Sequence, residues 1–308
     1  MRENALLARI ASLCAAAQPG LIVPVGDDCA MLELSGRRLL AAVDPVIEGV
    51  HFAKGTPGRL VGAKALKRNL SDVAAMAARP AACLLQLTLP PGCSEDEAFE
   101  VVRGVHETGL AFGCPLVGGD VSVGPAGCPL VASVTVLAEP WPGVEVVRRT
   151  GASPGDHVFV TGALGGSLEE TPGGAHHLAF VPRVELARML ASSAQTRPTA
   201  MMDLSDGLAQ DLPRLAAHAV IEIPRLPVSQ AAKKAAQKSG RSAWKHAVGD
   251  GEDYELLFAA SPLQSIPHEL AGVPITRIGS VTCGGGVRLM VDESTLLPMD
   301  GLGWEHRS

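Results

Sequence analysis

Short apolar segments that end at glycine, proline or charged residues recur along the first half of the chain. Apolar runs of this length with turn residues at their ends are typical of buried strands. The first run ends directly before Asp44, so its strand would deliver that carboxylate to one end of a sheet. The expected strands lie at 38–43, 47–52, 82–89 and 130–138.

Two stretches between these strands have the features of helices. At 59–78 apolar residues recur every three or four positions, and Pro80 is expected to end this helix, which carries Asp72. Ser94 and Glu97 have the spacing of a capping box, which opens a second helix. Strands that alternate with helices on one side predict an α+β sandwich.

The second half has the same mixture of elements. It follows a run at 139–143 with two prolines and a glycine, which is the best candidate linker. We therefore predict two α+β domains, 1–140 and 148–308. In the second, strands are expected at 157–161, 200–204, 255–260 and 274–278, helices at 184–192, 206–218 and 228–239, and a loop at 171–179.

Composition favours a globular protein and narrows its ligands. With 308 residues, of which 47% are hydrophobic, each domain can bury a core. The formal net charge of −6 provides no basic field for nucleic acid or an anionic membrane, and no apolar run is long enough to span a membrane. The seven cysteines are odd in number and form no CxxC pair, which favours reduced thiols in a cytoplasmic protein.

Carboxylates stand beside glycines at four points where an apolar run stops. A single pair of this kind is usually an ordinary turn, but four of them indicate a site for several cations and a phosphate ligand. Mg²⁺ prefers carboxylate and phosphate oxygens, and glycine lets the backbone approach a polyanion closely. The four clusters lie at 26–28, 118–120, 203–207 and 250–253.

Six aspartates at or near strand ends are the candidate metal ligands. If they converge, their mutual repulsion of several kcal/mol per pair at an intermediate dielectric is tolerable only with bound cations. If they are spread over the surface, they are ordinary solvated turn residues, and the sequence leaves both arrangements open. The six are Asp28, Asp44, Asp72, Asp120, Asp203 and Asp206.

The best-known signatures of phosphate and hydrolytic chemistry are absent from the sequence. It contains no GxxxxGK[ST] loop, no GxGxxG fingerprint, no protein-kinase motif set and no GxSxG elbow. The histidines form no HExxH or other close pair, which makes a zinc site improbable.

Seven segments together resemble, in order and spacing, the thiamine-monophosphate kinases of the aminoimidazole-ribonucleotide-synthetase-like superfamily. The match extends from about Leu21 to Trp304, and NLSDVAAM and GEDYELLF are its most specific parts. The segments are VGDDCAML, VDPVIEGVHF, ALKRNLSDVAAMAARP, LVGGD, RRTGASPGDHVFVTG, MMDLSDGL and GDGEDYELLF.

This resemblance implies the two-domain architecture of that superfamily. The N-terminal domain would be an α/β sandwich with a mixed sheet that binds ATP and Mg²⁺, and the C-terminal α+β domain would complete the active-site cleft. A homodimer is also implied, in which the N-terminal sheets of two subunits join into a barrel.

The resemblance further implies that the γ-phosphoryl group of ATP is transferred directly to thiamine monophosphate, giving thiamine diphosphate and ADP. Several Mg²⁺ ions would neutralise the phosphate charge, without a covalent phospho-enzyme. All six aspartates would be metal ligands, and Asp72, Asp120 and Asp206 would be catalytic. The implied ATP contacts are Gly119, Arg149 and Ser205, and the implied thiamine-phosphate contacts are His51, Glu252 and Trp304.

The chain departs from the family pattern near the implied metal and nucleotide contacts. Ala42 and Val43 stand where hydroxyl residues are usual before the aspartate, and Val121 and Val123 replace a threonine and an arginine of GGDTTRGP. Water can take the place of a lost hydroxyl ligand. These departures therefore bear on the number of bound ions and on ATP affinity. The loop at 171–179 is also shorter than the insertion usual in the family.

Two alternatives stay open at this point. The first is another ATP-dependent enzyme of the superfamily, but the chain ends in Ser308 rather than the cysteine used in hydrogenase maturation, and Cys29 lacks the setting of a selenophosphate synthetase. The second is a non-catalytic nucleotide or thiamine-phosphate binding protein, which Val43 and Val123 support and the retained carboxylates oppose.

One site assignment also stays open. Arg148 adjoins Arg149, and either could oppose the charge of a phosphate.

Overall fold

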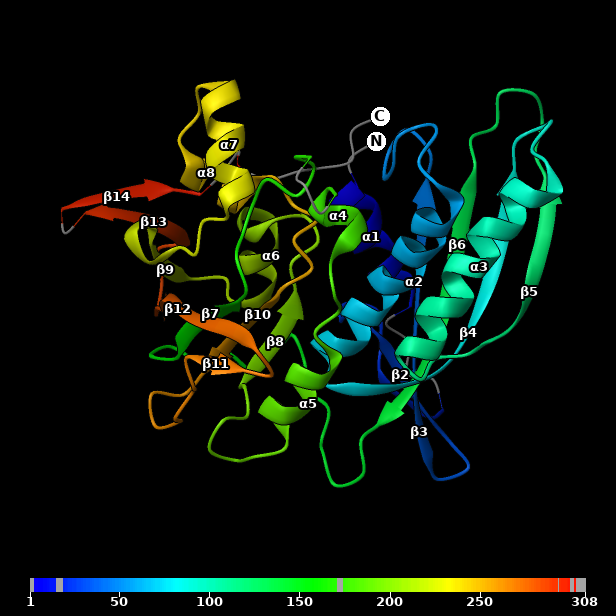
Figure 1. Ribbon diagram of the computed structural model, residues 1–308. Coiled ribbons are helices and arrows are strands. Elements are labelled where there is room, and N and C mark those ends of the chain that lie inside the picture. Colours follow the sequence, from blue (N-terminus) through cyan, green and yellow to red (C-terminus); the bar gives the residue numbers. More distant parts are fainter. Residues whose placement is uncertain (1–2, 15–18, 171–173, 293, 300–301, 303–308) are drawn as a thin grey trace.

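Two sheets and the helices around them make up the protein (Figure 1). The computed structural model describes residues 3–14, 19–170, 174–292, 294–299 and 302. The first sheet has the strand order β1-β2-β3-β6-β4-β5, in which only β4 and β5 run parallel, so the predicted mixed sheet is confirmed. Its strands are β1 (Leu21–Val23), β2 (Ala30–Leu34), β3 (Arg37–Ile47), β4 (Ala78–Leu89), β5 (Leu116–Val123) and β6 (Val131–Pro140).

Helices α2 (Gly58–Ala75) and α3 (Glu95–Ala111) cover one face of this sheet, and α1 (Glu3–Leu13) precedes it. The capping box is confirmed, because the Glu97 N–H donates to Ser94 Oγ and the Ser94 N–H donates back to the Glu97 carboxylate. The two covering helices approach closely at Gly62, where a Cβ would lie 1.9 Å from the carbonyl oxygen of Val101.

The second sheet has the order β14-β13-β9-β12-β7-β10-β8, with β11 beside β12. Its strands are β7 (His157–Thr161), β8 (Ala200–Asp203), β9 (Ala219–Glu222), β10 (Leu256–Ala260), β11 (Glu269–Leu270), β12 (Val273–Val281), β13 (Val287–Asp292) and β14 (Thr295–Pro298). The helices of this half are α4 (His176–Ala179), α5 (Val184–Ala191), α6 (Leu208–Leu215), the short 3₁₀ turn η1 (Ile223–Arg225), α7 (Gln230–Ser239) and α8 (Ala243–Gly249). The α+β class is therefore confirmed.

Helix α2 lies between the two sheets and joins them (Figure 1). One side of α2 packs on α3 and the first sheet, while another contacts α4, α5 and β8. Its last turn, at Ala74 and Ala75, belongs to an apolar cluster with Phe159 and Phe258, whose rings stack at 5.1 Å. Side chains that leave α2 toward the second half therefore face residues more than a hundred positions away in sequence.

Three predicted boundaries were wrong. One strand, β3, replaces the two expected at 38–43 and 47–52, and it runs through Pro45 because β2 pairs with β3 only as far as Ala41. Proline is tolerated on such an open strand edge. Helix α2 ends at Ala75, and Pro80 lies instead within β4, at a register shift in its pairing with β6.

Shorter elements of the second half were not predicted. The expected loop at 171–179 contains α4, while 171–173 lie outside the described residues. Strands β9, β13 and β14 and helix α8 have four to seven residues each, too few for a clear periodic signal. The first two residues of the linker expected at 139–143 belong to β6, which continues through Pro140. The domain limits 1–140 and 148–308 stay a prediction. No helix that the structure describes is long and apolar enough to cross a membrane.

Candidate active site

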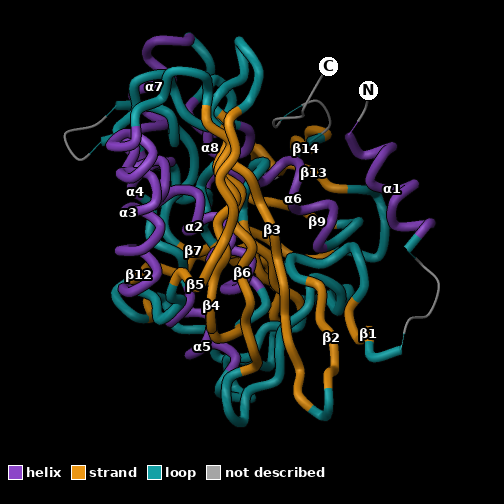
Figure 2. Tube along the Cα trace, turned by 90° about the vertical axis from the view of Figure 1, so that its right-hand side faces the viewer, coloured by secondary structure: helices purple, strands orange, loops and turns teal. Residues whose placement is uncertain are grey.

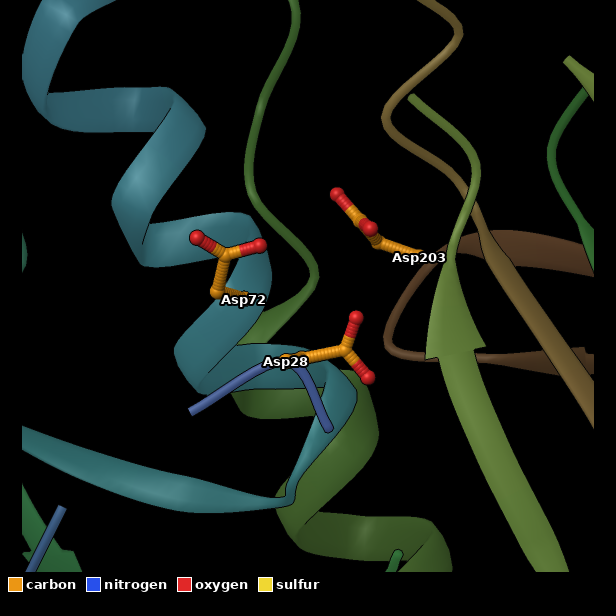
Figure 3. Close-up of side chains that lie close together, drawn as sticks. All are labelled: Asp28, Asp72 and Asp203. Atoms are coloured by element: carbon orange, nitrogen blue, oxygen red, sulfur yellow. The ribbon is translucent and has the colours of Figure 1, made fainter. Parts of the chain in front are cut away.

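Five of the six predicted aspartates line one cavity between the two halves of the protein. The cavity has a volume of about 410 Å³. Three of the five converge, since one carboxylate oxygen from each of Asp28, Asp72 and Asp203 lies within 4.8 Å of the others (Figure 3). Asp44 and Asp206 line the same cavity but form ion pairs, with Arg68 at 3.2 Å and Arg214 at 2.8 Å.

Each converging carboxylate comes from a different element. Asp28 lies in the turn before β2, Asp72 at the start of the last turn of α2, and Asp203 at the end of β8. A hydrogen bond of 2.6 Å from Ser71 Oγ to Asp203 Oδ2 fixes the helix against the strand. The motif NLSD therefore supplies both a carboxylate of the cluster and the hydroxyl that holds a second carboxylate in place.

Burial shifts the protonation of these carboxylates. Loss of hydration is the largest cause and raises the pKa of Asp28 to about 7, although the charge of Arg149 lowers it. Burial likewise raises the pKa of Asp203 to about 6, against the hydrogen bond from Ser71. The pKa of Asp72 lies well above its usual range because of burial and the charges of neighbouring carboxylates.

The donor set fits a hard divalent cation. Three carboxylates converge, and the buried Asp28 Oδ2 has no hydrogen-bond partner among the described residues. Oxygen-only donors of this kind are the ligands that Mg²⁺ prefers, usually together with phosphate oxygens and water. A bound cation would also favour the ionised carboxylates, which burial and their mutual repulsion oppose.

The pH dependence of stability should reveal this cluster. The pKa values of Asp28 and Asp203 lie above the ordinary 3.8, so between about pH 4 and pH 7 the folded metal-free protein binds more protons than the unfolded chain. Its free energy of unfolding should therefore fall as pH rises through this window. When urea unfolding is measured in EDTA at several pH values, the free energy of unfolding of Asp28→Asn should fall less steeply with pH than that of the wild type. An equally steep fall would contradict the assignment.

Arg149, and not its neighbour Arg148, lines the cavity. Its guanidinium Nη2 donates to Asp28 Oδ1 at 2.6 Å, and its backbone N–H donates to Asp27 at 3.1 Å. Arg148 instead lies 3.7 Å from Asp27 Oδ2, with half of its side chain exposed. The cationic group closest to the carboxylate cluster is thus the arginine that the sequence analysis favoured.

A second, smaller cavity of about 80 Å³ adjoins the first. The two cavities share four lining residues, which are His51, Arg68, Ser205 and Asp206. Glu252 and Tyr254 line only the smaller one, and the exposed apolar side chains of Val50 and Leu168 stand at its edge. The predicted residues His51 and Ser205 therefore line both cavities, and Glu252 lines the smaller one.

Two predicted residues lie apart from these cavities. Asp120 and Gly119 are on β5, the edge strand of the first sheet, and Asp120 pairs through Gln86 and Ser133 with Pro45. Strand β5 therefore lies three strand spacings, or about 14 Å, from β3. The register also places Asp120 on the opposite face of the sheet from Asp44. A Cβ on Gly119 would lie 1.8 Å from the Leu85 carbonyl oxygen, so strand packing alone requires this glycine. Trp304 lies outside the described residues.

Sequence reasoning missed several charged groups of the site. Arg68 and Arg214 line the main cavity, and Asp211 accepts the Asp206 N–H at 3.0 Å and so shapes the turn after β8. Only Arg68 had a signal in the sequence, because it lies four residues before Asp72 on the same helix. The buried Lys64 gave no signal, since its position reads as part of the apolar face.

The first half of the chain matches the family described as AIR synthase related protein, N-terminal domain, over residues 26–139. Together with the inter-sheet acidic cavity, this match defines a two-sheet protein of the AIR synthase-related class. The thiamine-monophosphate kinase of Rhodopirellula baltica is 39% identical over 281 residues, covering 85% of this chain and 84% of that protein. That of Salmonella typhimurium is 31% identical over 336 residues, covering 99% and 98%.

Among solved structures, AaThiL complexed with AMPPCP and TMP aligns with a TM-score of 0.83 and 29% sequence identity. The alignment covers 99% of this chain and 97% of that chain. The chain belongs to the thiamine-monophosphate kinase family.

Proposed function

We propose that this protein transfers the γ-phosphoryl group of ATP to thiamine monophosphate, giving thiamine diphosphate and ADP. The observation that carries this function is the convergence of Asp28, Asp72 and Asp203 at a cavity that opens into a second one lined by Glu252 and Tyr254. Family membership over nearly the whole chain supports the same reaction. An ATP analogue and TMP in the related AaThiL structure support these two ligands.

The larger cavity suits two phosphate-bearing molecules placed end to end. Asp28, Asp72 and Asp203 would hold Mg²⁺, with Asp44 and Asp206 within reach, and the bound ions would neutralise the phosphate charge that builds up in transfer. Arg149 and Arg68 add fixed positive charge that can pair with phosphate oxygens. Catalysis then consists mainly of positioning and electrostatic stabilisation.

The groups that line the smaller cavity complement the thiamine end of the acceptor. His51 and Glu252 provide polar contacts beside the apolar side chains of Val50 and Leu168. Burial opposes ionisation there, but the positive charge and the hydrogen bond of Lys64 outweigh it, so that the pKa of Glu252 is about 2 and its carboxylate is charged. An anionic group at this position complements a cationic thiazolium or an aminopyrimidine.

The assay that tests this function measures both products. With ATP, thiamine monophosphate and Mg²⁺, the protein should form ADP and thiamine diphosphate in equal amounts, and EDTA should abolish both. ATP binding by calorimetry without product would favour a non-catalytic homologue. ADP formation that needs no thiamine monophosphate would favour another ATP-dependent enzyme of the superfamily.

The uncovered face and edge of the first sheet support a homodimer. Figure 2 looks onto the face opposite α2 and α3, where the strands form the front layer. Val43, on this face, is 61% exposed, and Val121 and Val123 on the edge strand β5 are 60% and 69% exposed. Long apolar edge strands of this kind are normally paired or covered. Two subunits that share this surface would bury it.

Strand pairing in such a dimer would also give Asp120 a role. Beyond Ala41, no described strand pairs with β3 on its β2 side, so residues 42–47 leave an open edge beside Asp44. A two-fold dimer that pairs β5 of one subunit with this edge closes the two sheets into a barrel. Gly119 and Asp120 would then lie beside the segment of β3 that carries Asp44 of the other subunit.

A further inference from the structure

The side chain of Lys64 is fully buried at the junction between α2 and the second half of the protein. Its Nζ donates to the carbonyl oxygen of His51 at 2.6 Å and to His177 Nδ1 at 2.7 Å, and it forms a short ion pair with Glu252 Oε2. An ammonium group has three N–H donors and no acceptor. These three contacts therefore use all of its hydrogen-bonding capacity.

The three acceptors come from three separate segments. The His51 carbonyl belongs to the segment that leads into α2, His177 to α4, and Glu252 to the loop before β10. His177 Nδ1 also lies 3.2 Å from Glu252 Oε2. Because Nδ1 accepts from Lys64, the His177 proton is assigned to Nε2. A single amine thus connects both residues of the smaller cavity that are expected to contact the acceptor substrate.

Glu252 needs such support, because its backbone is strained. Its φ of 56° lies in the left-handed region, which is unfavourable for a residue with a side chain. Its N–H donates to the Ser205 carbonyl oxygen at 2.7 Å, and Tyr254 donates to Oε1 at 3.3 Å. With Oε2 engaged by Lys64, the orientation of the carboxylate in the cavity is set from three sides.

We propose that Lys64 is a positioning residue for the acceptor substrate, which fixes the His51 segment and the Glu252 carboxylate relative to each other across the two halves of the protein. This inference rests on the proposed function, since it assigns the smaller cavity to thiamine monophosphate. Lys64 itself does not line either cavity, so it acts through the residues that do.

Lys64→Met tests this role, because methionine keeps the unbranched shape and removes the charge and the three donors. The KM for thiamine monophosphate should rise by about 10- to 100-fold, as expected for a misplaced binding group, while the KM for ATP stays within about twofold. Lys67→Met is the matched control, because Lys67 is on the same helix and lies over the Phe180 ring at 5.8 Å, outside this network. It should leave both KM values near the wild type.

A double-mutant cycle separates positioning from a general structural role. If Lys64 acts through Glu252, the KM for thiamine monophosphate of Lys64→Met/Glu252→Gln should match that of Glu252→Gln alone. The double variant has no unpaired buried charge, so it serves as the test if Lys64→Met alone does not fold. Additive effects in the cycle, or equal rises in both KM values, would overturn the inference.

Calorimetric binding of thiamine monophosphate distinguishes a failure of the proposed function from a failure of the role of Lys64. If the wild type neither binds nor phosphorylates thiamine monophosphate, the proposed function fails and this inference with it. If the wild type does both and Lys64→Met binds with unchanged affinity, only the positioning role of Lys64 is overturned. Weaker binding by Lys64→Met, together with normal binding by Lys67→Met, supports it.

Discussion

Replacing Asp72 by asparagine is expected to lower the rate of thiamine diphosphate formation by at least about 10²- to 10³-fold, the usual cost of removing an essential electrostatic contact. Asp72 contributes a carboxylate oxygen to the cluster with Asp28 and Asp203. Asparagine keeps the shape of the side chain but removes the negative charge that a divalent cation needs. The loss should appear in kcat and should not be restored by more ATP.

The same substitution should stabilise the metal-free protein. The pKa of Asp72 is well above its usual range because burial and neighbouring carboxylates oppose its charge, and a neutral amide relieves that repulsion. In EDTA at pH 7.5, the free energy of unfolding of Asp72→Asn should therefore exceed that of the wild type.

Urea unfolding with and without Mg²⁺ measures both parts of this prediction. Mg²⁺ should stabilise the wild type more than the variant, so the order of stability should reverse as Mg²⁺ is added. Ser71→Ala is a useful companion, since it removes the hydroxyl bonded to Asp203 without removing a charge, and its activity should fall much less. An active Asp72→Asn enzyme would remove Asp72 from the metal site.

Mixed dimers of Asp72→Asn and Asp120→Asn subunits are expected to regain activity that neither variant has alone. In the proposed dimer, each site combines Asp72 of one subunit with Asp120 of the other. One of the two sites in a mixed dimer then carries both substitutions, and the other carries neither. A mixed dimer should therefore have about half of the wild-type activity.

Coexpression of the two chains with different tags, followed by two-step purification, yields the mixed dimer directly. Each parent homodimer should be nearly inactive and serves as the control. No recovered activity in the mixed dimer would place Asp120 in the site of its own subunit, against its position about three strand spacings from Asp44. A chain that elutes as a monomer would contradict the dimer itself.

The parts of this site that the sequence predicted are those with a local signal. Asp28, Asp44 and Asp203 stand where apolar runs end, and Asp72 lies on a helix with a clear periodic pattern, so each could be placed on its element. The resemblance to a known family then supplied their common role. That Asp28, Asp72 and Asp203 converge depends on contacts between segments up to 175 residues apart, which only the structure provides.

The missed features depend on tertiary contacts. Lys64 lies on the inner side of α2, and the sequence does not show that Glu252, 188 residues away, neutralises it there. The position of Asp120 follows from the sheet order, in which β5 lies at the edge although its motif resembles those of the central cluster. The strand through Pro45 likewise depends on which edge of β3 is left open. Local propensity does not contain this information.

The most direct test of the metal site is anomalous diffraction from crystals grown with Mn²⁺, a non-hydrolysable ATP analogue and thiamine monophosphate. We expect anomalous peaks at roughly 2.1 Å from carboxylate oxygens of Asp28, Asp72 and Asp203, between the two phosphate-bearing ligands. Clear density for both ligands without a metal peak at these three carboxylates would contradict the account.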